Sequence, residues 1–169
     1  MRSSDVPGDK CRTIRVNQLR EFEIVGTDRA EEIFEFCERQ GLSVDEGIDG
    51  DVIEYLVLRD EDGITATSSI ELFEGHPFVE MVAVRGDLRL GGIGREIVSE
   101  SLRRLMNCGY QSAWVVARKP RFFSSLGFAP EMDRNLVEKF LSKCHGCSQF
   151  GTTCAPEVLR FDLDTGKRP

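Results

Sequence analysis

The stretch of sequence that most constrains the fold is residues 79–108, in which an apolar run, a glycine-rich turn and an amphipathic helix follow one another. The run 79–84 is typical of a buried strand. Gly91, Gly92 and Gly94 then lead directly into the helix. Glycine lets backbone N–H groups approach a ligand closely, and the first turn of a helix leaves several N–H groups unpaired beside a partial positive charge. The stretch is therefore a candidate phosphate-binding turn.

The helix that follows the glycines is the best defined in the sequence, and we expect it to end near Cys108. Its spacing predicts a buried face formed by Ile93, Ile97, Val98, Leu102, Leu105 and Met106. The opposite face, which we expect to be exposed, is formed by Glu96, Glu100, Arg103 and Arg104. A helix that crosses between two strands makes those strands parallel. We therefore expect the strands 78–84 and 112–117, on either side of it, to run parallel.

The remaining segments predict a mixed domain. Further helices are expected at 30–40, 120–126 and 136–141, and further strands at 52–58, 64–73 and 158–163. Two more short strands, 13–16 and 21–25, are alternatives that can both be extended. Asp28 and Glu31 have the spacing of a capping box at the start of the first helix. Short turns join neighbouring strands as antiparallel hairpins. The fold class is therefore α/β (α+β), with a mixed, mostly antiparallel sheet and one crossover helix.

The length and charge of the chain narrow its class. The 169 residues are enough for one domain with a real core, which we place at 13–163, including the cysteine-containing segment 136–157, between tails at 1–12 and 164–169. The net charge is −7 and basic residues are scattered, which argues against a nucleic-acid surface. No apolar run approaches the roughly 20 residues that span a membrane, and the start lacks a signal peptide. We therefore expect a cytoplasmic protein without a disulfide framework.

Two common phosphate-binding motifs fit the glycine turn poorly. A P-loop requires a lysine after its last glycine, and this turn has none. A dinucleotide fingerprint requires a third glycine where this chain has Ile97. Six residues also separate Val84 from Gly91, whereas the fingerprint follows its strand directly. Neither motif explains the turn.

A third pattern fits the spacing on both sides of the turn. Val82-Ala83-Val84 is followed by four residues and then by Arg89-Leu90-Gly91-Gly92-Ile93-Gly94. A second mark follows at Phe122-Phe123-Ser124-Ser125-Leu126-Gly127-Phe128. With the order of elements, these segments resemble motif A and the Leu-Gly-Phe motif of the GNAT superfamily of acyl-CoA-dependent N-acetyltransferases, over residues 13–128. A tight turn that merely precedes a core helix would explain the glycines but not the arginine, the two spacings and the distal motif.

This resemblance implies a GNAT-like acyl-CoA N-acyltransferase fold with acetyl-CoA as co-substrate. It implies that N–H groups of the glycine turn bind the pyrophosphate of coenzyme A. It also implies that the preceding strand pairs with the pantetheine arm and polarises the thioester carbonyl. The residues implied in binding are Met81, Val82, Ala83, Val84, Arg89, Leu90, Gly91, Gly92, Ile93, Gly94 and Arg95, with Phe123 beside them.

The same resemblance implies direct attack by the amine of the acceptor, so that no protein nucleophile is needed. An α-amino group has a pKa near ~8, and a carboxylate usually removes its proton. Glu80 is the candidate catalytic base, because period-two alternation places it on the same face as Val82 and Val84. Many relatives carry the glutamate six residues before the final valine, where this chain has Phe78. A Glu80 that simply faces solvent is therefore an open alternative.

Other residues near this strand are weaker candidates. Glu71 and His76 are less favoured substitutes for the base, and His76 in Gly-His-Pro is typical of a turn. Phe123 stands where many relatives carry a tyrosine that protonates the leaving thiolate. Either the thiolate leaves unaided, as its moderate pKa permits, or another group donates the proton.

Three cysteines near the end of the chain, Cys144, Cys147 and Cys154, form the pattern Cys-x-x-Cys-x6-Cys. Zinc usually takes four ligands, so that a nearby histidine or a distant cysteine would have to complete a site. A redox-sensitive pair and reduced cysteines in a tight loop are the alternatives. We assign no metal site.

The tail carries a narrower resemblance. Residues 120–123, the Leu-Gly-Phe motif and the cysteine tail together resemble single-domain N-acetylglutamate-synthase-type acetyltransferases. The chain departs from them at Val116-Ala117, where threonines are common, and at Ser148, where proline is usual. The basic residues between strand and short helix could bind an acidic acceptor or form a solvated helix start; they are Arg118, Lys119 and Arg121.

We therefore expect an N-acetyltransferase that acts on the amine of a small molecule, leaning to an amino acid such as glutamate. Alternatives are a protein or peptide N-acetyltransferase and a non-catalytic acyl-CoA-binding sensor or interaction module on the same fold. The expected partners are the small-molecule amine acceptor, no nucleic acid and no membrane, and a homodimer is left open.

Overall fold

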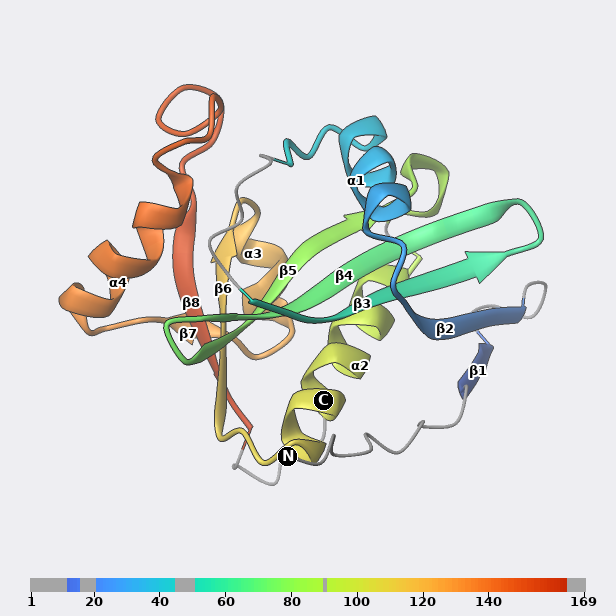
Figure 1. The fold of residues 1–169 in the computed structure, drawn as a ribbon, viewed down its shortest axis with the longest axis horizontal. Helices are drawn as coiled ribbons and strands as arrows, with labels where there is room; N and C mark the ends of the chain where they lie inside the picture. Colours follow the sequence, from blue (N-terminus) through green and yellow to red (C-terminus); the bar gives the residue numbers. More distant parts are fainter. Residues whose placement is uncertain (1–11, 16–20, 45–50, 90, 164–169) are drawn as a thin grey trace, which may run out of the picture.

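The computed structural model describes residues 12–15, 21–44, 51–89 and 91–163. In this part of the chain, one eight-stranded sheet carries helices on both faces (Figure 1). The predicted tail at 1–12 lies outside the described residues except for Arg12, and the tail at 164–169 lies entirely outside them. The division into one domain and two tails therefore stays a prediction.

The sheet is mixed and mostly antiparallel. Its strands are β1 (Arg12–Arg15), β2 (Glu21–Thr27), β3 (Asp51–Asp60), β4 (Gly63–Phe73), β5 (His76–Val84), β6 (Ser112–Ala117), β7 (Ala129–Pro130) and β8 (Glu157–Asp162). Their order is β1-β2-β3-β4-β5-β6-β8-β7. Neighbouring strands are antiparallel except β5 and β6, which are parallel. The predicted fold class and the parallel pair at the crossover helix are confirmed, and both alternative N-terminal strands are present.

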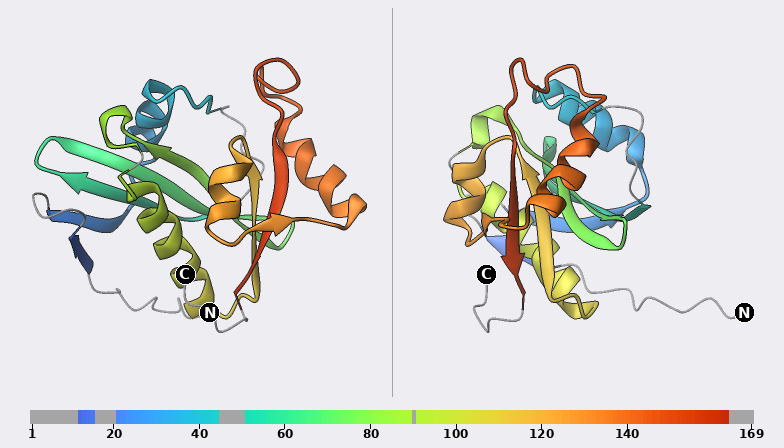
Figure 2. Two further views of the ribbon diagram at one scale, coloured as in Figure 1. Left: turned by 180° about the vertical axis from the view of Figure 1, so that it is seen from behind. Right: turned by 90° about the vertical axis from the view of Figure 1, so that its left-hand side faces the viewer.

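The helices form a layer on each face of the sheet. They are α1 (Ala30–Arg39), α2 (Ile93–Asn107), α3 (Pro120–Ser125) and α4 (Arg134–Leu141), with short 3-10 turns η1 (Gly86–Leu88) and η2 (Ser142–Cys144). The apolar side chains of α2 and α3 pack into the largest core, on one face. Those of α1 and α4 pack into two smaller cores on the other face (Figure 2). The charged groups of the candidate site lie on the face that carries α1 and α4.

The long helix α2 follows its predicted pattern with two exceptions. Its buried apolar residues are Ile93, Ile97, Val98, Leu102 and Leu105. Met106, predicted to be buried, is 43% exposed, whereas Glu100, predicted to be exposed, is 5% exposed. Glu100 accepts hydrogen bonds from Arg103 and Arg104, and these charge-assisted bonds compensate its burial. The spacing alone could not show this, because the partners sit on the same helix face as the carboxylate.

The first helix begins one residue later than a capping box would require. Its N-cap is Arg29, which makes no side-chain capping bond within the described residues. The Arg29 N–H instead donates to the hydroxyl of Thr27 at 3.2 Å. The predicted capping box at Asp28 and Glu31 is therefore wrong. Gly41, with φ of 79°, follows the end of the helix, and the predicted stop there is confirmed.

Candidate active site

The site begins where the parallel strands β5 and β6 separate. Phe78 of β5 pairs with Trp114 of β6, and this is the one pair recorded between the two strands in the described residues. Figure 1 shows the strands diverging beyond it. This pair forms the vertex of the separation, and aromatic packing holds it in place. The ring centroid of Phe140 from α4 lies 4.8 Å from that of Phe78 and 5.8 Å from that of Trp114. Beyond this fixed vertex the C-terminal ends of β5 and β6 separate, and we refer to this separation of the strands as the opening.

A bulge in β5 lies beside this opening. The register between β4 and β5 shifts between Thr67 and Ser69, so that Met81 and Val82 together oppose a single β4 residue. Met81 has φ of 50°, in the left-handed region that a residue with a side chain rarely adopts. Its carbonyl accepts a hydrogen bond from the Thr67 hydroxyl at 2.9 Å and lies 3.8 Å from the buried thiol of Cys37. The surrounding core thus fixes a strained backbone where the thioester site is predicted.

The bulge changes which side chains share a face. Val79, Val82 and Val84 all pack with the core formed by α2. Glu80 lies on the opposite face, where its carboxylate contacts Lys143 from the turn after α4. The prediction that Glu80 shares a face with Val82 and Val84 is therefore wrong, because the extra residue of the bulge interrupts the two-residue period. Its role as the base stays a prediction.

Beyond the bulge, β5 directs backbone groups toward the opening. The Arg85 N–H donates to the carbonyl of Thr65 in β4 at 2.8 Å. N–H groups of successive residues point to opposite sides of a strand. The N–H of Val84, the neighbouring residue, therefore points away from β4, toward β6. This is a group that a pantetheine arm would need.

The start of α2 faces the same opening. Gly92 is its N-cap, has φ of 84° and offers no side chain as a cap. A Cβ built on Gly92 would meet none of the described atoms within 4 Å, whereas one built on Gly94 would lie 3.1 Å from the ring of Phe122. The first-turn N–H groups of residues 93–95 have no intrahelical partners, as at any helix start. They are free to bind an anion, and Gly94 lets the ring close the site from the α3 side. Leu90 lies outside the described residues.

Two arginines from opposite sides of the opening meet the end of α1. Arg89 donates to the carbonyls of Val84 at 3.3 Å and Gln40 at 3.2 Å. Arg118, directly after β6, donates to the carbonyl of Gly41 at 2.7 Å. Sequence reasoning placed Arg89 beside the pyrophosphate, which stays a prediction, and considered Arg118 only for the acceptor. The structure brings both positive charges to the mouth of the opening.

Two other candidate residues lie in packed aromatic clusters. Phe123 is 7% exposed and packs against Phe122 and Phe128, with ring centroids 4.9 and 5.5 Å away. Phe122, rather than Phe123, is the ring that lies over the first turn of α2. His76 packs edge-on against Trp114 at 5.1 Å, at the far end of β5. The predicted place of Phe123 beside the coenzyme is not tested by these contacts.

Three charged side chains meet on the α1–α4 face beside the bulge. Glu71 is fully buried, and the Ser69 hydroxyl donates to its Oε1 atom at 2.6 Å. The Lys143 Nζ atom lies 3.9 Å from Oε2 of Glu71 and 2.8 Å from Oε1 of Glu80. Burial and the charge of Glu80 raise the pKa of Glu71 to about 7. Sequence reasoning ranked Glu71 below Glu80 and missed Lys143, which no local pattern connects to β5.

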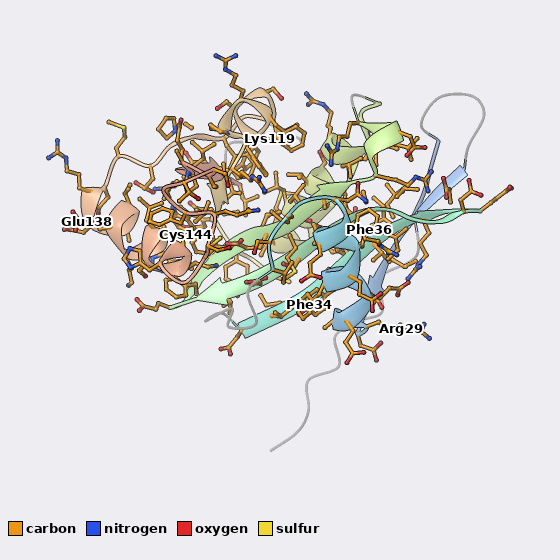
Figure 3. All side chains as sticks on the ribbon, turned by 90° about the horizontal axis from the view of Figure 1, so that it is seen from above. Arg29, Phe34, Phe36, Lys119, Glu138 and Cys144 are labelled. Atoms are coloured by element: carbon orange, nitrogen blue, oxygen red, sulfur yellow. The ribbon has the colours of Figure 1, made fainter. Side chains whose placement is uncertain are left out.

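The cysteine segment folds over this charged group. Cys144 directly follows Lys143, and burial, followed by the charge of Glu80, raises the pKa of its thiol to about 11. Figure 3 shows Cys144 over the sheet, with Glu138 at the outer edge of α4. Cys144, Cys147 and Cys154 are free thiols. Within the described residues, no three His, Cys, Asp or Glu side chains are grouped so that they could hold a metal ion.

Comparisons with known proteins agree on the fold. The model of the acetyltransferase (GNAT) family matches residues 12–128. N-acetylglutamate synthase from Neisseria gonorrhoeae, complexed with coenzyme A and N-acetyl-glutamate, has a TM-score of 0.61 and 13% identity, over 84% of this chain and 35% of that chain. A GNAT-family acetyltransferase from Staphylococcus aureus Mu50 has a TM-score of 0.61 and 13% identity, over 84% of this chain and 99% of that chain. The ribosomal-protein-S18-alanine N-acetyltransferase from Escherichia coli has a TM-score of 0.56 and 14% identity, over 82% of this chain and 90% of that chain.

At these identities the similar structures establish the fold, and this chain spans about a third of the length of the Neisseria synthase. Coenzyme A is bound in that structure, in agreement with the predicted acetyl-CoA. In the described part of the chain, no helix combines the length and apolar character needed to cross a membrane. The family match covers well over half of the chain and confirms the predicted N-acetyltransferase class of enzyme. The chain therefore belongs to the acetyltransferase (GNAT) family.

Proposed function

We propose that the chain transfers an acetyl group from acetyl-CoA to the amine of a small molecule, by direct attack in a ternary complex. The observation that carries this proposal is the divergence of β5 from β6 beyond Phe78 and Trp114. Within the described residues, one side of β5 is left without a paired strand beside a strained bulge and near the start of α2. We propose that this separation forms a cleft that holds an extended thioester by main-chain hydrogen bonds.

In this proposal the coenzyme occupies the cleft from α2 to the bulge. N–H groups at residues 91–95 bind the pyrophosphate, and the positive end of the helix favours its charge. Arg89 stands beside it, close enough to exchange its present carbonyl partners for phosphate oxygens. The pantetheine arm follows residues 81–84, and an N–H of this strand stabilises the oxyanion of the tetrahedral intermediate.

The amine must lose a proton before it attacks. Glu80, the base predicted from the sequence, directly precedes the bulge and is 2.8 Å from Lys143. It is therefore near the place proposed for the thioester. The leaving thiolate has a moderate pKa and needs no protein acid in this proposal.

The acceptor is proposed to be a small amine, leaning to an amino acid such as glutamate. Exposed basic residues border the β6 side of the cleft and could bind the carboxylates of such an acceptor; they are Arg118, Lys119 and Arg121. The fold is shared with the Neisseria N-acetylglutamate synthase but also with the Escherichia coli enzyme that acetylates a ribosomal protein. A protein or peptide acceptor is therefore the second candidate.

One assay tests the proposal. The purified chain is incubated with acetyl-CoA and a panel of amino acids, other amines and peptides. The release of free thiol is followed over time, and the products are identified by mass spectrometry. We expect thiol release in step with acetylation of one class of small amine. Turnover of peptides alone would favour the second candidate. Tight coenzyme A binding without turnover of any acceptor would contradict the enzyme and indicate an acyl-CoA sensor.

A further inference from the structure

The Oε2 atom of Glu71 is a buried charge-bearing atom without a hydrogen bond. Its side chain is fully buried, and no donor among the described residues lies within hydrogen-bonding range of Oε2. The other oxygen, Oε1, accepts from Ser69. Leaving a buried carboxylate oxygen unpaired is costly, so such an atom in a native core is a candidate for a functional role.

Among the described residues, Lys143 forms the ion pair recorded with this atom. Its Nζ atom is 3.9 Å from Oε2 of Glu71 and donates to Glu80 at 2.8 Å. The same ammonium lies 4.3 Å from the ring centroid of Phe78 and 5.3 Å from that of Phe73. Two carboxylates and two aromatic faces around one point form a place that binds a primary ammonium group.

This inference rests on the proposed function. We propose that Glu71, in place of the Glu80 predicted from the sequence, is the catalytic base, and that the ammonium of the acceptor takes the place that the ammonium of Lys143 occupies, with Glu80 as its second partner. Lys143 comes from a short turn after α4, so its side chain can leave without disturbing the sheet. Its departure opens Oε2 to the incoming amine. Glu80 then binds the acceptor, and Glu71 receives the proton.

The charged and titratable groups recorded around Glu71 in the described residues affect its proton affinity. Glu80 from β5 raises the pKa of Glu71, whereas Lys143 from η2 and the hydrogen bond from Ser69 lower it. Tyr55 from β3 interacts with the carboxylate, because burial and then the charge of Glu71 raise the pKa of Tyr55. With burial as the largest cause, the net pKa of about 7 matches the requirement for a base near neutral pH.

The chemistry balances without a further reactant. The acceptor ammonium gives one proton to the Glu71 carboxylate, which becomes a carboxylic acid. The neutral amine attacks the thioester carbonyl carbon, so that the new C–N bond forms and the C–S bond breaks. The second proton of the nitrogen leaves with the thiolate, giving free coenzyme A. Glu71 returns its proton to solvent after the amide departs.

The test is the pH dependence of kcat/KM, which reports ionisations of the free enzyme. For the wild-type chain we expect kcat/KM to rise with pH through an apparent pKa near that of Glu71 and to level off above it. Glu71→Gln should lose this limb and about 10²-fold or more of kcat/KM. Glu61→Gln, in the exposed turn after β3, removes the same charge and should match the wild type.

Two variants separate a base from a buried structural group. Lys143→Met removes a positive neighbour of Glu71. The rise of kcat/KM with pH, here called the limb, should therefore move to higher pH by roughly one pH unit. Glu80→Gln removes a negative neighbour and should move the limb of the remaining activity down. Unchanged limbs in both variants, or wild-type turnover by a folded Glu71→Gln, would overturn the assignment. Absence of turnover by the wild-type chain would instead overturn the proposed function itself.

Discussion

Phe78 pairs with Trp114 at the point from which the parallel strands β5 and β6 separate. Both residues belong to the aromatic cluster that α4 completes, so the closed end of the cleft is rigid. The open end carries the bulge at Met81 and the start of α2. Among the described residues, no strand pairs with this side of β5 beyond the vertex, so an extended ligand could pair with it there without reorganising the sheet.

The glycine at the start of α2 gives a prediction for coenzyme binding. Gly92→Glu places a negative charge beside the first turn of the helix, where the pyrophosphate is proposed to lie, and should weaken coenzyme A binding roughly tenfold or more relative to Gly92→Gln. Both variants put a side chain at φ of 84°, so the strain is matched and only the charge differs. Titration calorimetry measures the affinities. Equal affinities of the two variants would argue against the loop assignment.

The bulge gives a prediction for stability. Thr67 donates a buried hydrogen bond to the carbonyl of Met81, so Thr67→Val leaves that carbonyl without its side-chain donor and should cost about 1–3 kcal/mol of unfolding free energy. Thr67→Ser keeps the hydroxyl and should bind acetyl-CoA more tightly than Thr67→Val does. Urea unfolding and calorimetry provide the two readouts. If the valine variant were as stable as wild type and bound equally well, the hydroxyl would not be what holds the bulge.

Glu71 also gives a prediction for the pH dependence of stability. Its pKa is about 7 in the folded chain against 4.5 for an ordinary glutamate, so the folded state binds the proton more tightly. This contribution is favourable at low pH and is lost as the pH rises from about 4.5 to about 7. Between ~pH 4 and ~pH 8, wild type should therefore lose about 3 kcal/mol of unfolding free energy relative to Glu71→Gln.

The control for this measurement is Glu61→Gln, whose stability should follow that of wild type across the same range. Unfolding by urea at each pH gives the free energies. A constant difference between wild type and Glu71→Gln would mean that Glu71 titrates alike in the folded and unfolded chain.

The cysteines give a prediction for reactivity. Cys108 is exposed. Burial raises the pKa of the Cys37 thiol. Burial, followed by the charge of Glu80, raises the pKa of the Cys144 thiol to about 11. Only the thiolate is alkylated, so Cys108 should react well before Cys37 and Cys144 at neutral pH. Peptide mass spectrometry after a timed pulse of alkylating reagent gives the rate at each thiol. Cys144 reacting as fast as Cys108 would contradict the structure.

Features coded within one segment were predictable from the sequence. The span of β6 was predicted to the residue, and α2 was predicted to within one residue, because strand and helix periods and glycine stops are local. The crossover rule then gave the parallel pair. The motif at residues 82–94, its spacing and the distal Leu-Gly-Phe motif, with which the order of elements agrees, led to the correct family.

Features that depend on contacts between segments were not predictable. The bulge at Met81 carries no glycine, so nothing local indicates a left-handed residue, and the face of Glu80 was assigned wrongly. Glu100 is buried because arginines on its own helix neutralise it. Lys143 reaches Glu80 from 63 positions later in the chain, which only the packing of α4 on the sheet can produce.

The central claim is that acetyl-CoA binds in the cleft between β5 and β6, with its pyrophosphate on the first turn of α2. Amide hydrogen exchange with and without acetyl-CoA tests it most directly, because the claim names the backbone groups involved. We predict slower exchange at Val82 and Val84 and at residues 92–95 when acetyl-CoA is present. Unchanged exchange at these positions, with protection elsewhere at saturating acetyl-CoA, would contradict the account.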